Sequence, residues 1–127
     1  MTKFWVESSN DNFDTMLFMQ KGKRYTWALF MGHLALEKLF KALFAKIHKD
    51  DPEAPRIHNL VVLAERCNLT LTDKQHTELR LINTFNTEAR YADYKNAFYK
   101  TCDKEFTDKQ VKIIKENVEW LKKLIEK

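Results

Sequence analysis

The chain has 127 residues, 44% of them hydrophobic, and a formal net charge of +4. This length suits one domain, and the hydrophobic content excludes a disordered tail because it is enough to bury a core. Only two glycines and two prolines occur, which disfavours a sheet with many tight turns and favours long helices. The mild positive charge is typical of lysine-rich helical surfaces, and it also permits a surface that binds phosphate.

The sequence predicts no signal for export and no membrane segment. Residues 1–12 include Glu7 and Asp11 and have no apolar run, so we expect no secretion signal. No stretch reaches the roughly 18 apolar residues of a membrane span. Cys67 and Cys102 lack the spacing of a metal site, so we expect reduced thiols, although one disulfide stays open. These features predict a cytoplasmic protein without membrane contact.

Two helices are predicted in the first part of the chain. Apolar residues recur on one face over residues 3–21, and Gly22 follows as a natural helix stop. The second helix, at about residues 25–48, is apolar on nearly every side, which is typical of the central helix of a bundle. Within it, Gly32 predicts a close helix crossing or, alternatively, a tolerated weak point.

The rest of the chain contains a loop and three further predicted helices. Residues 49–56 hold both prolines and three acids and predict a surface loop, followed by a short helix at about residues 59–67. The segment TDKQ occurs at residues 72–75 and again at residues 107–110, and both copies fit a capping box. We therefore predict two long helices that begin there, whereas the intervening residues 88–106 show no clear period. Together the elements predict an all-α fold.

The predicted architecture is an up-and-down bundle of four long helices plus a short helix, in a single domain over residues 4–125. Strong stand-alone catalytic motifs are absent from the sequence: it has no glycine-rich phosphate loop, no His-Glu-x-x-His and no Cys-x-x-Cys. The four histidines, His33, His48, His58 and His76, are scattered, so we expect no metal site and no cofactor.

One polar stripe interrupts the apolar second helix. His33, Glu37 and Lys41 are four residues apart, which makes them neighbours on one helix face. The structural interpretation is a Glu37–Lys41 ion pair on a strip that faces a loop or a partner helix. The functional interpretation is a charged wall of a cleft.

A second candidate site is the segment RYADYKN, at residues 90–96. Arg90 stands there beside tyrosines, and an arginine with aromatic neighbours can hold a phosphate and stack a base. The residues concerned are Arg90, Asp93, Tyr94, Lys95 and Asn96. The alternative is a helix end held by an Arg90–Asp93 pair, with the tyrosines as packing.

Three stretches carry a resemblance to a known family. They are WALFMGHLALEKLFKALFAK at residues 27–46, HNLVVL at residues 58–63 and EARYADY at residues 88–94. In this order and spacing they resemble the HEPN (higher eukaryotes and prokaryotes nucleotide-binding) domain over almost the whole chain. The resemblance implies a bundle of four or five helices, usually paired as a homodimer, with Glu37 and Lys41 beside the family's cleft.

The resemblance also implies a choice of activities. Many HEPN proteins are metal-independent RNases, often toxins, with an arginine followed after four to six residues by a histidine. Arg90 matches that arginine, but Lys95, Asn96 and Ala97 occupy the positions of the histidine. Other members act as the toxin half of a toxin–antitoxin pair, beside a separately encoded nucleotidyltransferase.

The sequence thus favours a nucleotide- or RNA-binding homodimer over an enzyme, with a separate nucleotidyltransferase as the protein partner that the resemblance suggests. The expected ligand site comprises residues on two helices: Glu37 and Lys41 with Arg90, Asp93, Tyr94, Lys95 and Asn96. One alternative is a divergent RNase in which Tyr94, Lys95 or Asn96 replaces the missing histidine. The other alternative is a purely structural helical dimer.

Overall fold

The protein is a bundle of six helices, seen here in a computed structural model that describes the backbone of residues 1–90 and 92–127 and the side chains of residues 1–87 and 97–127. The helices are α1 (Thr2–Lys21), α2 (Tyr25–Ile47), α3 (Leu60–Arg66), α4 (Asp73–Arg90), α5 (Ala92–Thr101) and α6 (Lys104–Glu126). The described residues include no strand, and the predicted all-α bundle is confirmed.

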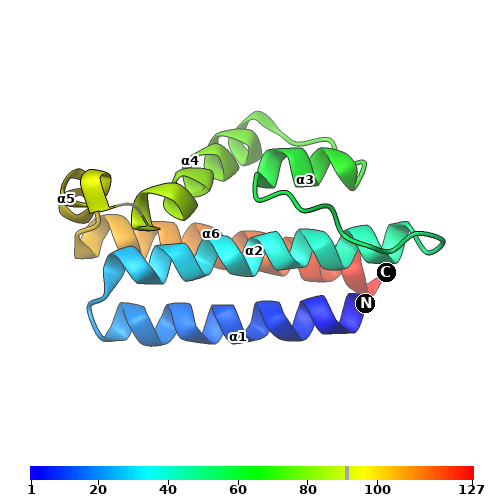
Figure 1. Ribbon diagram of the computed structural model, residues 1–127, viewed down its shortest axis with the longest axis horizontal. Helices are drawn as coiled ribbons and strands as arrows, with labels where there is room; N and C mark the ends of the chain where they lie inside the picture. Colours follow the sequence, from blue (N-terminus) through cyan, green and yellow to red (C-terminus); the bar gives the residue numbers. More distant parts are fainter. Residues whose placement is uncertain (91) are drawn as a thin grey trace.

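The helix α2 lies at the centre of the bundle, as its all-round apolarity predicts. It contacts each of the other five helices. Figure 1 shows α1 along one side of α2, α3 and α4 along the opposite side, and α6 behind it. Leu36, Leu39 and Phe40 of α2 are completely buried. The polar residues that α2 carries must therefore find partners inside the protein.

At Gly32 the helix α2 lies close to both α1 and α6. A Cβ atom at this position would lie 2.5 Å from Cδ1 of Ile114 in α6 and 2.9 Å from Sδ of Met16 in α1. Both distances are below any normal carbon contact, and both neighbouring side chains are fully buried. The close crossing that the sequence predicted is confirmed, since a Cβ atom at residue 32 would force the ends of both side chains to shift.

The first turn of the chain differs slightly from the expected one. Helix α1 does end at Lys21, directly before Gly22, but Gly22 itself has a φ of −80°. The left-handed conformation falls on Lys23, whose φ is 61°. The amides of Lys23 and Arg24 nevertheless bond to the carbonyls of Gln20 and Met19, so the last turn of α1 is satisfied.

The two TDKQ segments have different structures. At residues 72–75 the capping box is present: the amide of Gln75 donates to Oγ1 of Thr72 at 3.1 Å, and the amide of Thr72 donates to Oε1 of Gln75 at 2.9 Å. At residues 107–110 the predicted helix start is wrong. Helix α6 already begins at Lys104, because Asp103 accepts the amide of Phe106 at 2.8 Å and caps the helix before the repeat is reached.

Helix α5 is an addition to the predicted elements, since residues 92–101 showed no helical period. It connects α4 to α6 through Phe98, whose ring lies 5.8 Å from that of Phe85. Cys67 and Cys102 are buried thiols. Burial raises the pKa of Cys67 to about 12. None of the described helices is long and apolar enough to cross a membrane.

Candidate functional site

The polar stripe of α2 is buried as an ion pair. Nζ of Lys41 donates to Oε2 of Glu37 at 2.9 Å, and the two side chains are only 9% and 6% exposed. The ammonium of Lys41 also lies 5.4 Å from the ring centre of Trp5 in α1, close enough for a cation–π contact. The structural interpretation of Glu37 and Lys41 is therefore correct as far as the pair is concerned, and both charges are compensated within the bundle.

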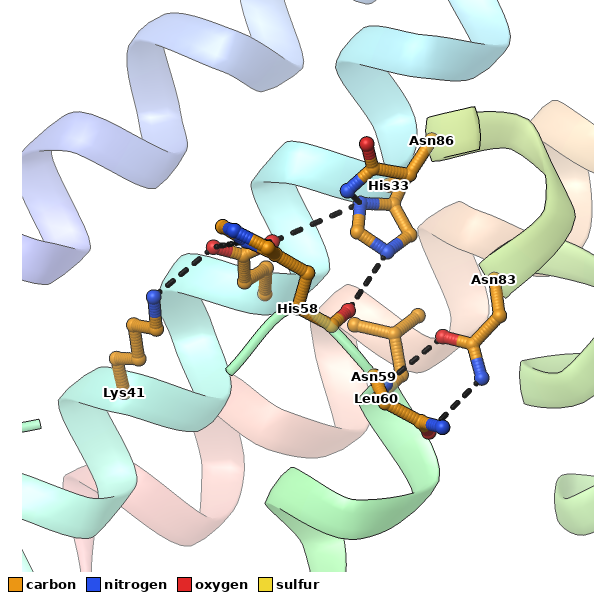
Figure 2. A network of polar contacts seen from close by, with 8 residues as sticks. His33, Lys41, His58, Asn59, Leu60, Asn83 and Asn86 are labelled. Atoms are coloured by element: carbon orange, nitrogen blue, oxygen red, sulfur yellow. Dashed lines mark hydrogen bonds and ion pairs between the residues drawn. The ribbon is translucent and has the colours of Figure 1, made fainter. Parts of the chain in front are cut away.

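His58 covers the open side of Glu37. The connection from α2 to α3 brings this residue back over α2, so that its Nδ1 lies 3.1 Å from both carboxylate oxygens (Figure 2). A carboxylate only accepts, so Nδ1 carries the hydrogen and donates it. The imidazole is 67% exposed, which leaves its Nε2 edge accessible. A buried acid thus holds the orientation of an accessible histidine.

His33 ties this connection to α4. Its Nε2 donates to the backbone carbonyl of His58 at 3.0 Å. Its Nδ1 lies 3.5 Å from the amide nitrogen of Asn86 and 3.8 Å from Oε1 of Glu37. An amide nitrogen is a donor only, so Nδ1 accepts there. The loop at residue 58 and helix α4 are therefore linked through one imidazole, which lies beside the carboxylate of Glu37.

Two further asparagines fasten the start of α3 to α4. Oδ1 of Asn59 accepts the amides of Val61 and Val62 as the N-cap of α3. Asn83 of α4 donates from Nδ2 to the same oxygen at 3.0 Å and accepts the amide of Leu60 at 2.8 Å. These bonds fix the orientation of both side-chain amides (Figure 2).

A polar pocket of about 260 Å³ lies between this loop and α4, lined by His58, Asn59, Asn83, Asn86 and Thr87. A second pocket of about 240 Å³ adjoins it and shares two of these residues, Asn59 and Asn83. The second pocket adds His76 and Arg80 from the preceding turns of α4. The two pockets together follow one face of α4, because residues three and four apart on a helix are neighbours.

The predicted site residues fall into two groups. Glu37 and Lys41 belong to the network beneath this groove. The side chains of Arg90, Asp93, Tyr94, Lys95 and Asn96 lie outside the described residues. The backbone of α4 continues through Arg90, one turn after Asn86, so the predicted segment follows the groove directly along the chain.

None of the five described residues that line the first pocket was predicted as a site residue: His58, Asn59, Asn83, Asn86 and Thr87. One signal was available for two of them, since Asn83 and Asn86 are three residues apart on a helix whose other face is apolar. No cluster of three or more potential metal ligands occurs among the described residues. The first pocket therefore provides hydrogen bonding by the oriented side-chain amides of its asparagines and by the accessible imidazole of His58.

Comparison with known proteins identifies the family. A family model of the HEPN domain matches residues 2–124. We found no significant match among curated proteins or among solved structures. The matched segment contains the central helix α2, the loop with His58 and the whole of α4. The chain therefore belongs to the HEPN domain family.

Proposed function

We propose that this protein is a nucleotide- or RNA-binding module, and that the ligand lies along α4 from the polar groove to the segment that contains Arg90. The observation that carries the proposal is the groove itself. It is open, its described lining is polar, and the last described residue of that lining, Thr87, lies one turn before Arg90 on α4. The net charge of +4 and the HEPN family are consistent with a polyanionic ligand.

The proposal includes a homodimer, which HEPN domains often form. Phe4 and Phe18 support it: they lie near one face of α1 and are 59% and 74% exposed. A separate nucleotidyltransferase, in a toxin–antitoxin pair, is the protein partner that we propose on the strength of the family. Light scattering of the purified protein tests the dimer, since a monomer mass at working concentration would contradict it.

The test of ligand binding is a gel-shift titration at low salt with a mixed pool of single-stranded RNA. Wild type is compared with Arg90→Ala and with Arg66→Ala, a matched control that removes the same charge from the exposed end of α3, outside both pockets. We expect Arg90→Ala to weaken binding about tenfold, as loss of a charge-assisted phosphate contact does, and Arg66→Ala to change it little. If no RNA or nucleotide is bound, the ligand proposal is wrong, and the structural dimer becomes the better account.

A divergent, metal-independent RNase is the second candidate, and His58 favours it. An imidazole with Nδ1 held by a buried carboxylate and Nε2 accessible has the arrangement of a general base or acid. Such a residue would supply the acid–base chemistry that Lys95, Asn96 and Ala97 do not. RNA recovered from the titration in EDTA should be intact if the protein only binds. Cleavage that is lost in both Arg90→Ala and His58→Gln would establish the enzyme instead.

A further inference from the structure

We infer that the pocket between His58 and α4 binds an unpaired nucleobase, which Asn86 recognises through its side-chain amide. This inference rests on the proposed function and assigns it a place on the described surface. Its ligand is a base carried either by single-stranded RNA or by a free nucleotide. The polar groups of the pocket that are already bonded, and those that are available, decide what it can hold.

The described lining of the pocket is unsuited to a phosphate. Among the described residues that line it there is no arginine or lysine, and these side chains or vacant backbone amides are what hold phosphate groups. The backbone amides at the start of α3, those of Leu60, Val61 and Val62, already donate to the side chains of Asn83 and Asn59. The available groups are therefore neutral donors and acceptors, which suit an uncharged polar ring.

Asn86 offers both halves of an amide to a ligand. The residue is only 7% exposed, yet it lines the pocket. One hydrogen of its Nδ2 goes to His33, and no described residue donates to its Oδ1. The second hydrogen and the oxygen remain, side by side. An asparagine amide of this kind pairs with the adjacent donor and acceptor on the edge of a base.

The residues around the side-chain amide of Asn86 are fixed by hydrogen bonds of their own. His33 is fixed by the carbonyl of His58, and Asn59 and Asn83 are bonded to each other, so the wall of the pocket is formed before a ligand arrives. The volume of about 260 Å³ is below the roughly 300 Å³ at which pockets for drug-sized ligands begin. A single ring system is the appropriate size of occupant.

The adjoining pocket contains an arginine that could contact the sugar and phosphate of a nucleotide whose base lies in the first pocket. Arg80 lies two turns before Thr87 on α4 and lines the adjoining pocket with His76. A base that contacts Asn86 would place its sugar and phosphate toward Arg80 on one side or toward the last turn of α4, which ends at residue 90, on the other. The base pocket thus lies between two arginines of one helix.

The experiment compares ligands of equal charge with and without bases. Fluorescence anisotropy measures binding of oligouridylate, oligoadenylate and an abasic ribose-phosphate chain of the same length. For wild type we expect at least one of the two base-bearing chains to bind about tenfold more tightly than the abasic chain, which is within the range of one good amide–base contact. Competition with uridine monophosphate or adenosine monophosphate shows whether the ligand is RNA or a free nucleotide. If the protein prefers free nucleotides, the monophosphate should displace the labelled chain at a concentration similar to that of the unlabelled chain.

Two variants assign the preference to this pocket. Asn86→Leu removes both halves of the amide without adding a charge, and Thr87→Trp fills the pocket from its exposed rim without touching the buried network. Both should abolish the preference for base-bearing chains and leave affinity for the abasic chain unchanged. Thr77→Trp, on an exposed position of α4 outside both pockets, is the matched control and should behave as wild type.

The outcomes separate the two proposals. Equal affinity of wild type for base-bearing and abasic chains, or a preference that survives both pocket variants, overturns the base pocket while RNA binding through Arg90 still holds. Failure of wild type to bind any of the three chains overturns the proposed function and the base pocket together.

Discussion

The two sides of helix α2 are both buried, but they are stabilised in different ways. At Gly32 the side toward α1 and α6 has no room for a methyl group, and its neighbours are apolar. One residue further along, the side that begins with His33 carries Glu37 and Lys41, which form an ion pair, and the carboxylate of Glu37 also accepts a hydrogen bond from His58. Shape stabilises the first side, and matched polar partners stabilise the second. The free energy of unfolding should therefore depend on side-chain volume on the first side and on the pairing of charges on the second.

The largest effect is expected from Lys41→Met. It keeps an unbranched side chain as far as Cε but leaves the carboxylate of Glu37 in the interior without its ammonium partner. Removing one member of a buried ion pair typically costs about 3 kcal/mol or more. Urea denaturation monitored by circular dichroism measures the change in the free energy of unfolding.

Two controls show whether the effect belongs to the buried charge. The double variant Glu37→Leu with Lys41→Met removes both charges and should recover most of the lost stability. Lys104→Met breaks a pair with the same spacing, Lys104–Asp108, whose side chains are 77% and 41% exposed, and should change stability little. If the double variant is as unstable as Lys41→Met alone, charge pairing does not stabilise this side of α2.

On the other side of α2, Gly32→Ala tests close packing. Alanine favours a helix over glycine by about 1 kcal/mol, but its Cβ would overlap Ile114 and Met16. Because overpacking of a core costs about 1–3 kcal/mol, we expect a net loss of about 1 kcal/mol. Ile114→Val removes Cδ1, the atom nearest to the added Cβ, so the same Gly32→Ala change should cost less in that background. Equal costs in the two backgrounds would contradict the packing account.

The TDKQ pair extends the comparison to identical sequences. Gln75 caps a helix on the surface, so Gln75→Met should lower the free energy of unfolding by about 0.5–1 kcal/mol. Gln110 is 4% exposed inside α6, and no described residue donates to its Oε1. Gln110→Met removes an unpaired buried oxygen and should raise stability by about 1 kcal/mol. Thermal unfolding of the two variants should therefore shift in opposite directions, and a shift of both in the same direction would refute this assignment.

The smallest effect on stability is expected from ionisation of the Cys67 thiol. The reactivity of this thiol measures how far water is excluded from the apolar interior. Its Sγ donates to the carbonyl of Phe40 at 3.3 Å, and burial raises its pKa to about 12. The thiol should therefore not react with a disulfide reagent at pH 8 in a Cys102→Ala background until the protein unfolds. Since the folded pKa lies above the unfolded value of 9.0, this thiol favours the folded state below pH 9 and loses that contribution as the pH rises toward 12. Rapid labelling of folded protein at pH 8 would show that the interior is open at this point.

The same contrast explains how far the sequence predicts the structure. Regular apolar spacing on α2 and glycine at position 32 are local signals, and they predicted the central helix and its close crossing. The i,i+4 spacing of Glu37 and Lys41 likewise predicted their pairing. His58 and Asn86 join that network from other elements, and nothing near them in the sequence indicates it.

Helix boundaries show the same limit on a smaller scale. The second TDKQ misled because Asp103 caps the amide of Phe106 and so starts α6 at Lys104, before the repeat is reached. Both segments satisfy the capping pattern by residue type, but only the first has no competing cap directly before it. The choice between two adjacent caps depends on how the chain enters the helix, and α5 sets that path here.

The most direct test of the account is amide hydrogen exchange of the full chain with and without a saturating single-stranded RNA oligomer. If the ligand lies along α4 beside the polar side of α2, RNA should slow exchange in residues 57–62 and 80–87 and leave α1 (Thr2–Lys21) unchanged apart from any dimer contact already present without RNA. Slowed exchange confined to α1 or to the C-terminal half of α6, or no change in any segment at saturating RNA, would contradict a binding site in this groove.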